Sequence, residues 1–126
     1  MNNTLDFNKK SILITGATGK IGKKICKKFA SLNANLILVD LDIKNLENLK
    51  KKLIRYNQIK INIFKCNFLF EKEILNVCRD IKKKKIKIDV IINNAAFTGG
   101  TQVKGWNTLF KNQSYQTFNK ALTVNL

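Results

Sequence analysis

Short apolar runs alternate with segments of helical period along most of this chain, and this alternation restricts the fold more than any other feature. Strand character is found at 11–15, 35–40, 59–65 and 88–92, and the helices between these runs are marked by Ile21, Ile25, Phe29 and Leu32, by Leu46, Leu49, Leu53 and Tyr56, and by Ile74, Leu75, Cys78 and Ile81. Strand–helix–strand units cross over in the right-handed sense, which makes the strands parallel and covers both faces of the sheet with helices. The pattern therefore predicts an α/β fold with a doubly wound parallel sheet in three layers.

The chain is predicted to be a single domain over residues 1–126. It is long enough to bury a core, and no repeat, linker or change of composition divides it. The stretch 97–112 is polar, contains glycine and is longer than a simple connection, so we expect a functional loop on the substrate side. A last helix is expected over 114–126, with Phe118, Leu122 and Leu126 on one side.

Three glycines, Gly16, Gly19 and Gly22, lie between the first predicted strand and the first predicted helix. Glycine accepts a positive φ and lets the backbone approach a ligand, and the free N–H groups and dipole of the following helix attract an anion. The spacing G-x-x-G-x-x-G differs from the usual G-x-G-x-x-G of dinucleotide-binding turns. The position of the glycines between a strand and a helix is what favours a cradle for the pyrophosphate of a dinucleotide over a plain surface turn. A P-loop is excluded, because only two residues separate Gly16 from Gly19 and Ile21 stands where Ser or Thr would bind magnesium.

Asp40 ends the second predicted strand, 18 residues after Gly22. A carboxylate at this place accepts hydrogen bonds from the adenosine ribose and repels a 2′-phosphate. The next residues, Leu41, Asp42 and Ile43, include no Arg or Lys that would bind such a phosphate. The sequence therefore favours NAD over NADP as the cofactor. The alternative is that Asp40 is a polar strand-end residue that leads into a helix cap.

Five motifs stand in the order and spacing of the short-chain dehydrogenase/reductase family: TGATGKIG at 15–22, Asp40, CNF at 66–68, NNAA at 93–96 and VNL at 124–126. The chain resembles the N-terminal, cofactor-binding part of that family over nearly its whole length. The resemblance implies a Rossmann-type sheet with strand order 3-2-1-4 in an NAD(P)-dependent oxidoreductase that acts on a carbonyl or secondary alcohol. It implies contacts to the cofactor from Gly16, Thr18, Gly19, Lys20, Ile21 and Gly22 at the pyrophosphate, Asn67 and Phe68 beside the adenine, and Asn94, Ala95 and Ala96 farther along. Ala96 departs from the glycine that is usual there.

The catalytic residues that the resemblance implies are incomplete. Asn125 matches the helix asparagine that holds a water in the family's proton relay; the alternative is a helix-interior Asn that bonds the backbone. Proton transfer in the family belongs to a Tyr and a Lys one helical turn apart on a later helix, assisted by a Ser. Tyr56 lies far from the nicotinamide end, and Tyr115 is followed one turn later by Asn119 instead of Lys. We therefore expect the N-terminal half of a longer reductase, inactive by itself, with an uncovered edge at the fourth strand.

The net charge is +16, and 22 of the 24 basic residues are lysines, with only Arg55 and Arg79 as arginines. Nucleic-acid recognition favours the planar guanidinium of arginine, so a dedicated binding protein would contain more of it. The lysines are therefore better explained as solvated helix surfaces, and an A/T-rich coding sequence would also raise their number. No apolar run approaches the roughly 20 residues that span a bilayer, so no membrane segment is expected. With no histidine, no metal site is expected, and the three scattered cysteines are predicted to be packed, reduced thiols of a cytoplasmic protein.

The expected partner is a small carbonyl or alcohol substrate, and a homo-oligomer is expected for the full-length protein. The loop that contains Trp106 and Phe110 resembles that of family members in bacterial surface-sugar biosynthesis. Two other functions stay open: a non-catalytic NAD-binding or scaffold protein, and a basic nucleic-acid partner. A downstream Ser and YxxxK motif would exclude the first, and binding that collapses with modest salt would favour the second.

Overall fold

The computed structural model describes residues 6–55, 59–98 and 103–125, so Tyr56 and Leu126 lie outside the described residues. The elements are β1 (Ser11–Thr15), α1 (Lys20–Ser31), β2 (Asn35–Asp40), α2 (Ile43–Leu53), β3 (Ile61–Lys65), α3 (Glu71–Lys83), β4 (Val90–Ile92), a short 3-10 helix η1 (Phe110–Asn112) and α4 (Tyr115–Asn125). The strands are parallel and ordered β3-β2-β1-β4. The predicted doubly wound α/β fold and its strand order are confirmed.

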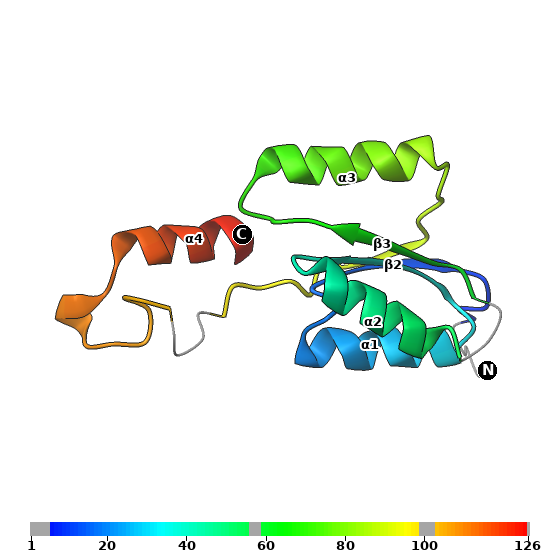
Figure 1. The fold of residues 1–126 in the computed structure, drawn as a ribbon, viewed down its shortest axis with the longest axis horizontal. Helices are drawn as coiled ribbons and strands as arrows, with labels where there is room; N and C mark the ends of the chain where they lie inside the picture. The colour runs from blue at the N-terminus through cyan, green and yellow to red at the C-terminus, as the bar shows by residue number, and fades with distance from the viewer. Residues whose placement is uncertain (1–5, 56–58, 99–102, 126) are drawn as a thin grey trace, which may run out of the picture.

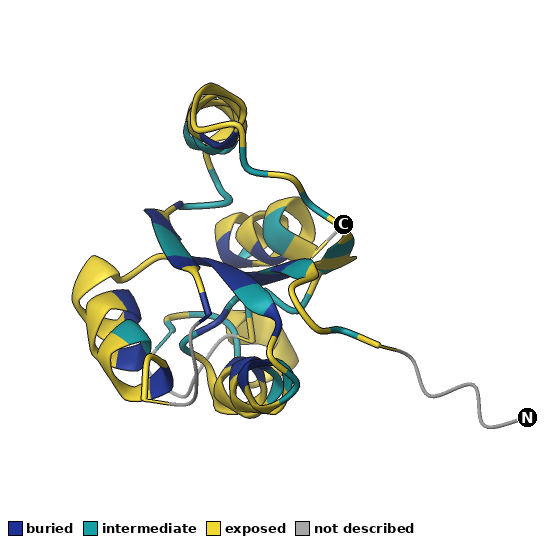
Figure 2. Cartoon of the chain, turned by 90° about the vertical axis from the view of Figure 1, so that its right-hand side faces the viewer, coloured by how far each residue is buried: buried dark blue, intermediate teal, exposed yellow. Residues whose placement is uncertain are grey.

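Helices cover both faces of the sheet: α1 and α2 lie against one face and α3 against the other (Figure 1). Successive side chains of a strand point to opposite faces. Leu36 and Leu38 of β2 therefore join the core beneath α1 and α2, whereas Ile37 and Val39 join the core beneath α3. Because both faces are covered, β2 is buried along its apolar run, as is typical of an inner parallel strand (Figure 2).

α1 packs against the sheet through small residues. Its buried positions recur one turn apart, at Gly22, Cys26 and Ala30. The prediction that Ile21 belongs to the apolar face is wrong, because its side chain is 67% exposed. The small side chains let the helix approach the strands closely, which turns the buried stripe away from Ile21 and leaves Phe29 only partly buried.

α3 has less buried surface than α1 and α2. Ile81 is the one residue of the helix that is classed as buried, while Val77 packs partly buried against the same core. Cys78 was predicted to be packed but is exposed, because it lies about 100° farther around the helix than Val77. Cys26 and Cys66 are buried as predicted, and burial raises the pKa of the Cys26 thiol to about 12.

β4 forms an edge of the sheet beside β1, with no further strand along its other side among the described residues. Its middle residue, Ile91, is 58% exposed, so the predicted uncovered edge is confirmed. The Asp89 carboxylate accepts a hydrogen bond from the Ser11 N–H at 2.9 Å, and the Asp89 N–H donates to the Ser11 carbonyl at 2.9 Å. This reciprocal pair joins the amino ends of β1 and β4.

The later part of the stretch 97–112 folds back on the start of α4. The Ser114 N–H donates to the Gly105 carbonyl at 2.9 Å, and the Thr117 hydroxyl donates to the Lys104 carbonyl at 2.9 Å. Gly105 has a φ of +74°, and a Cβ there would lie 2.4 Å from the Cβ of Ser114. The described end of the expected loop is therefore held against α4 by specific bonds.

α4 lies beyond the carboxyl ends of the strands (Figure 1). Its buried residues are Thr117 and Ala121. Phe118 and Leu122, predicted to form the apolar side, are 53% and 39% exposed, because the folded-back connection packs against the neighbouring face of the helix. Among the described residues, no helix has the length and apolar character needed to cross a membrane.

Candidate functional site

Two adjoining cavities lie at the carboxyl ends of the strands, where the turn after β1, the end of β2 and the segment after β4 meet. Their volumes are about 610 and 300 Å³. The larger is lined by Gly16, Thr18, Gly19, Lys20, Ile21, Gly22, Asp40, Asn94, Ala95 and Ala96, and the smaller is lined in addition by Asn67 and Phe68. The structure therefore brings together in one cleft every residue that the sequence assigned to cofactor binding.

Gly16 brings the turn after β1 against the segment that follows β4. Its φ is +63°, and a Cβ there would lie 2.8 Å from the Cα of Ala95. The Asn94 amide donates from Nδ2 to the carbonyls of Thr15 and Gly16 at 3.0 and 3.1 Å. The Thr15 hydroxyl accepts from the N–H groups of Asn94 and Ala95, both at 3.0 Å. These bonds satisfy the polar backbone of both turns and hold the base of the cleft in place.

The amino end of α1 has the properties of an anion site. Its N-cap is Gly19, no side chain caps it, and its first turn contains no acidic residue. Among the described residues, the backbone N–H groups of Lys20, Ile21 and Gly22 have no acceptor. In contrast, α2 is capped by the carboxylate of Asp42. The partial positive charge at the start of α1 is therefore directed, uncompensated, at the larger cavity.

Gly22 lets this helix end lie against the turn. A Cβ at Gly22 would lie 2.1 Å from the carbonyl oxygen of Gly16 and 2.9 Å from the Cα of Ala17. Gly19 is different, because its φ is −68° and a Cβ there would meet only the Gly16 carbonyl oxygen at 3.3 Å. Of the three glycines, Gly16 and Gly22 are required by the backbone packing, and Gly19 is not.

Asp40 connects the end of β2 to the glycine turn. One carboxylate oxygen accepts from the Thr18 N–H at 2.8 Å, and the other accepts from the Leu41 N–H at 2.7 Å. A carboxylate offers about four acceptor positions, so both oxygens can accept further bonds from ligand hydroxyls. The cap of α2 is provided by Asp42, which accepts from Asn45, and Asp40 takes no part in it.

The smaller cavity lies between the end of β3 and the segment after β4. Asn67 is held on both sides: its Oδ1 accepts from the Leu69 N–H at 3.0 Å, and its N–H donates to the Glu73 carboxylate at 2.7 Å. Its Nδ2 has no partner among the described residues. Phe68 and the buried Cys66, whose thiol pKa is raised by burial, add apolar lining. A mostly apolar cavity with one free amide donor suits a planar heterocycle.

Asn125 connects α4 to the segment after β4. Its Oδ1 accepts from the Phe97 N–H at 2.6 Å, and its Nδ2 donates to the Phe97 carbonyl at 3.2 Å. The side chain thus bonds backbone, as one interpretation of the sequence expected, but the backbone belongs to a distant segment and not to its own helix. The Phe97 ring meets Trp106 edge-on, with ring centroids 5.5 Å apart. These contacts fix the backbone that lines the smaller cavity.

The sequence profile of the short chain dehydrogenase family matches residues 10–126. The chain belongs to this family. The 3-oxoacyl-(acyl-carrier-protein) reductase FabG of Rickettsia typhi is 30% identical over 122 residues, and that of Rickettsia conorii is 28% identical over 122 residues. Each alignment covers 97% of this chain and 44% of the relative, so the chain spans less than half the length of these curated relatives.

Solved structures of short-chain oxidoreductases share the fold of this chain. NAD+-bound xylitol dehydrogenase superposes with a TM-score of 0.81 at 23% identity, over 95% of the chain and 44% of the solved chain. A metagenomic short-chain oxidoreductase in complex with NADP superposes with a TM-score of 0.81 at 19% identity, over 96% and 52%. The predicted family membership and Rossmann-type fold are confirmed.

Four residues of the chain have a part in the site that differs from the one expected, or that the sequence did not indicate. Thr15 was not singled out, although the hydroxyl beside the first glycine of TGATGKIG is the local signal that could have identified it. Val124, beside Asn125 in VNL, also lines the smaller cavity. Ala96 does not have a positive φ, so its methyl group adds no backbone strain where the family usually has glycine. Tyr115 is 73% exposed and lines neither cavity.

Proposed function

We propose that this chain is the cofactor-binding part of an NAD-dependent oxidoreductase that acts on a carbonyl or a secondary alcohol. The observation that carries the proposal is the uncapped amino end of α1 in a cleft that also contains Asp40. Membership of the short chain dehydrogenase family supports the reaction class. A nicotinamide cofactor, when bound, would supply the hydride for a carbonyl or accept it from an alcohol.

The larger cavity fits a pyrophosphate. The N–H groups of Lys20, Ile21 and Gly22 would donate to phosphate oxygens, and the dipole of α1 would stabilise their charge. Because Gly16 has no side chain, its turn can lie against Ala95, and both residues line this cavity. The residues of this chain therefore fit the charged centre of a dinucleotide.

The ribose and adenine would lie toward the smaller cavity. The Asp40 carboxylate would accept from both ribose hydroxyls while it keeps its bond to the Thr18 N–H. A 2′-phosphate would place a second negative charge against this carboxylate, and this repulsion favours NAD over NADP. Asn67 and Phe68 would flank the adenine, with the amide Nδ2 as the donor.

Asn125 is proposed as a positioning residue for the nicotinamide end. Its two hydrogen bonds to Phe97 hold the backbone segment that leads away from the cleft. By resemblance to the family, Asn125 would also hold the water of the proton relay. Among the described residues, no tyrosine lines the cleft beside it, and Tyr115 lies outside both cavities. We therefore propose that these 126 residues bind the cofactor without catalysing the reaction.

Calorimetric titration with NAD tests the binding proposal. We expect the unaltered chain to bind and Gly16→Val to lose binding, because a branched side chain at a φ of +63° would meet the backbone of Ala95. Gly19→Ala is the control, since a Cβ there would meet only the Gly16 carbonyl oxygen at 3.3 Å, which a small shift relieves, and binding should persist. Energy transfer from Trp106, the single tryptophan, to bound NADH gives an independent reading. A folded Gly16→Val variant with unchanged NAD affinity would refute the cradle.

An activity assay tests the second half of the proposal. The chain is mixed with NADH and a panel of ketoses and simple ketones, and the nicotinamide absorbance is followed. We expect no turnover, because loss of an acid/base group typically lowers a rate about 10²–10⁴-fold. Ketoses are included because of the sugar-related resemblance of the loop that contains Trp106. Turnover that disappears in Tyr115→Phe would contradict the proposal and locate the proton transfer at Tyr115.

A further inference from the structure

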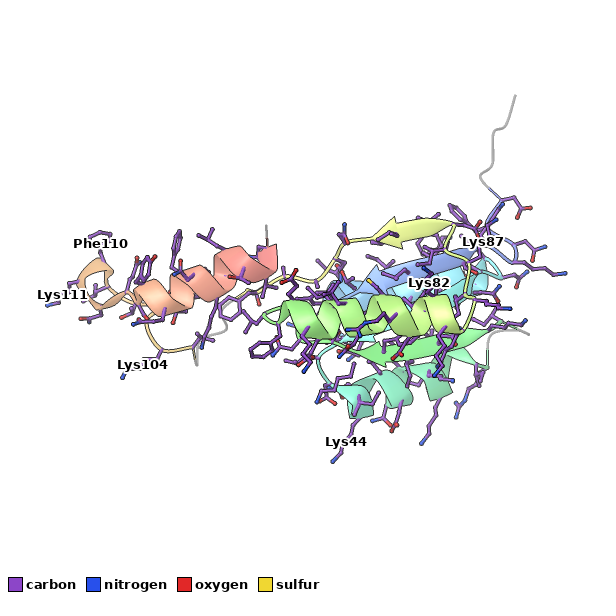
Figure 3. The ribbon with its side chains drawn as sticks, turned by 90° about the horizontal axis from the view of Figure 1, so that it is seen from above. Lys44, Lys82, Lys87, Lys104, Phe110 and Lys111 are labelled. Atoms are coloured by element: carbon purple, nitrogen blue, oxygen red, sulfur yellow. The ribbon has the colours of Figure 1, made fainter. Side chains whose placement is uncertain are left out.

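The positive charge of the chain is unevenly divided between the two helical layers. α1 has five lysines and no acidic residue, and α2 has four lysines and one glutamate. On the opposite face, α3 has four basic and three acidic residues. α1 and α2 lie side by side on their face of the sheet (Figure 1), and Lys44 of α2 extends away from the body (Figure 3). The α1–α2 face is therefore a nearly unmixed basic surface.

This surface is hollowed between the two helices. A groove of about 640 Å³ is lined by Lys23, Lys27, Asn45, Asn48, Leu49, Lys52, Leu53 and Arg55. The buried residues Leu49 and Leu53 form its floor, and the basic side chains stand along its exposed walls. No acidic residue lines the groove, and Lys23, Lys52 and Arg55 have no ion-pair partner within the described part of the chain. The groove thus presents uncompensated positive charge in a concave shape.

We propose that this α1–α2 groove binds the phosphate backbone of a single nucleic-acid strand. Lys23 and Lys27 are one helical turn apart, about 6 Å along α1, a distance over which a strand in duplex geometry presents roughly two phosphates. Lysine binds phosphate as a point charge without the bidentate fork that reads bases. The small number of arginines is therefore an argument against base recognition but not against phosphate binding. Asn45 and Asn48 add amide donors for phosphate and sugar oxygens.

The residues that line the groove also bear on whether such binding would depend on base sequence. Among the described residues that line the groove, none is aromatic, so these residues give bases no surface on which to stack, and we expect the affinity to depend little on sequence. A bilayer surface fits less well, because the apolar side chains of Leu49 and Leu53 lie at the floor of a hollow instead of projecting from it. A linear polyanion is the partner whose charge and shape match.

The groove is separate from the proposed cofactor cleft. None of its lining residues lines either cavity at the carboxyl ends of the strands. Saturation with NAD should therefore leave nucleic-acid binding unchanged, and a variant that loses NAD should retain it. The inference does not depend on the proposed function.

Fluorescence anisotropy with a labelled single-stranded RNA oligonucleotide of mixed sequence tests the inference. The groove variant combines Lys23→Ala, Lys52→Ala and Arg55→Ala, all at exposed positions. We expect it to bind roughly tenfold or more weakly at about 0.1 M salt, and its plot of log affinity against log salt to be flatter by about 2 units. The control variant removes the same charge from α3 through Lys72→Ala, Lys82→Ala and Lys83→Ala and should bind almost as the unaltered chain does. Circular dichroism verifies that both variants fold.

Four results would overturn the inference. Equal weakening in the groove and control variants would show that only net charge matters. Displacement of the RNA by NAD would locate its binding in the cofactor cleft. Absence of RNA binding, combined with groove-dependent binding to phosphatidylserine vesicles, would assign the groove to a lipid surface. Absence of RNA binding with groove-dependent binding to an acidic peptide would assign it to a protein.

Discussion

Substitution of Gly22 by alanine tests whether the packing of α1 against the glycine turn requires a residue without a side chain at this position. Gly22 lies in the first turn of α1, where an alanine would ordinarily stabilise a helix by about 1 kcal/mol. The geometry here reverses that sign. A Cβ at this position would lie 2.1 Å from the Gly16 carbonyl oxygen, and its other two near neighbours, both in Ala17, are also backbone atoms.

The magnitude follows from the displacement that the methyl group requires. Real Cβ contacts stay above 3.0 Å, so the Gly16 carbonyl oxygen and the helix must separate by roughly 0.9 Å, the difference between 3.0 and 2.1 Å. That oxygen accepts from the Asn94 Nδ2 and from the Gly19 N–H, each at 3.1 Å. Overpacking costs about 1–3 kcal/mol and each weakened hydrogen bond about 1 kcal/mol. Together these losses come to about 3–5 kcal/mol. The higher helix propensity of alanine offsets about 1 kcal/mol, so we expect Gly22→Ala to lower the free energy of unfolding by about 2–4 kcal/mol.

Urea denaturation followed by circular dichroism measures this loss, and thermal denaturation should show a Tm lower by roughly 10 °C. NAD affinity, measured by calorimetry under conditions in which the variant remains folded, should also fall, because the turn that lines the cleft has moved. Gly19→Ala is the control: its Cβ meets one atom at 3.3 Å, and we expect a change of at most about 1 kcal/mol from the altered N-cap. A Gly22→Ala variant as stable as the unaltered chain, with equal NAD affinity, would refute the reasoning.

Two further perturbations test the cleft and the sheet. Asp40→Ala should weaken NAD binding about 10–100-fold and reduce the preference for NAD over NADP, because the carboxylate no longer accepts hydrogen bonds from the ribose or the Thr18 N–H. Stronger binding of NADP than of NAD by the unaltered chain would contradict this. The hydrogen bond from the Ser11 N–H, and then that from Lys87, hold the pKa of Asp89 below its ordinary value of 3.8. The stability that Asp89 contributes is therefore present above that pH and lost as the pH falls through its lower folded-state pKa. In Asp89→Asn, the free energy of unfolding measured by urea titration should therefore fall less steeply as the pH is lowered. An identical decline in both proteins would argue against this role.

The strand positions show how far a one-dimensional pattern reaches. Strands 11–15 and 35–40 were predicted at their observed bounds, because they lie inside the sheet and each has an apolar run with a polar residue at either end. The runs 59–65 and 88–92 were predicted too long, since the observed strands are Ile61–Lys65 and Val90–Ile92. These two strands form the edges of the sheet. The length of an edge strand depends on which of its residues pair with the neighbouring strand, and a hydropathy pattern does not contain that information.

The candidate site divides in the same way. The glycine turn and Asp40 are recognisable from the sequence, because each is a local device: a backbone that must turn sharply after a strand, and an acidic residue at a strand end. The closure of the cleft is not local. The Thr15 hydroxyl holds the Asn94 and Ala95 N–H groups 79 and 80 residues away, and Asn125 reaches back 28 residues to Phe97. Which residues so distant in sequence share a hydrogen bond depends on the strand order.

By itself, the sequence determined the alternation of strands and helices, the glycine turn after the first strand and the excess of lysine, because each depends on residues that are neighbours in the chain. Only the tertiary structure decided that α1 buries Gly22, Cys26 and Ala30 and exposes Ile21, and that lysines of α1 and α2 line one groove. The orientation of a helix about its axis depends on how closely the sheet lets it approach, and that distance is set by backbone contacts such as Gly22 against Gly16.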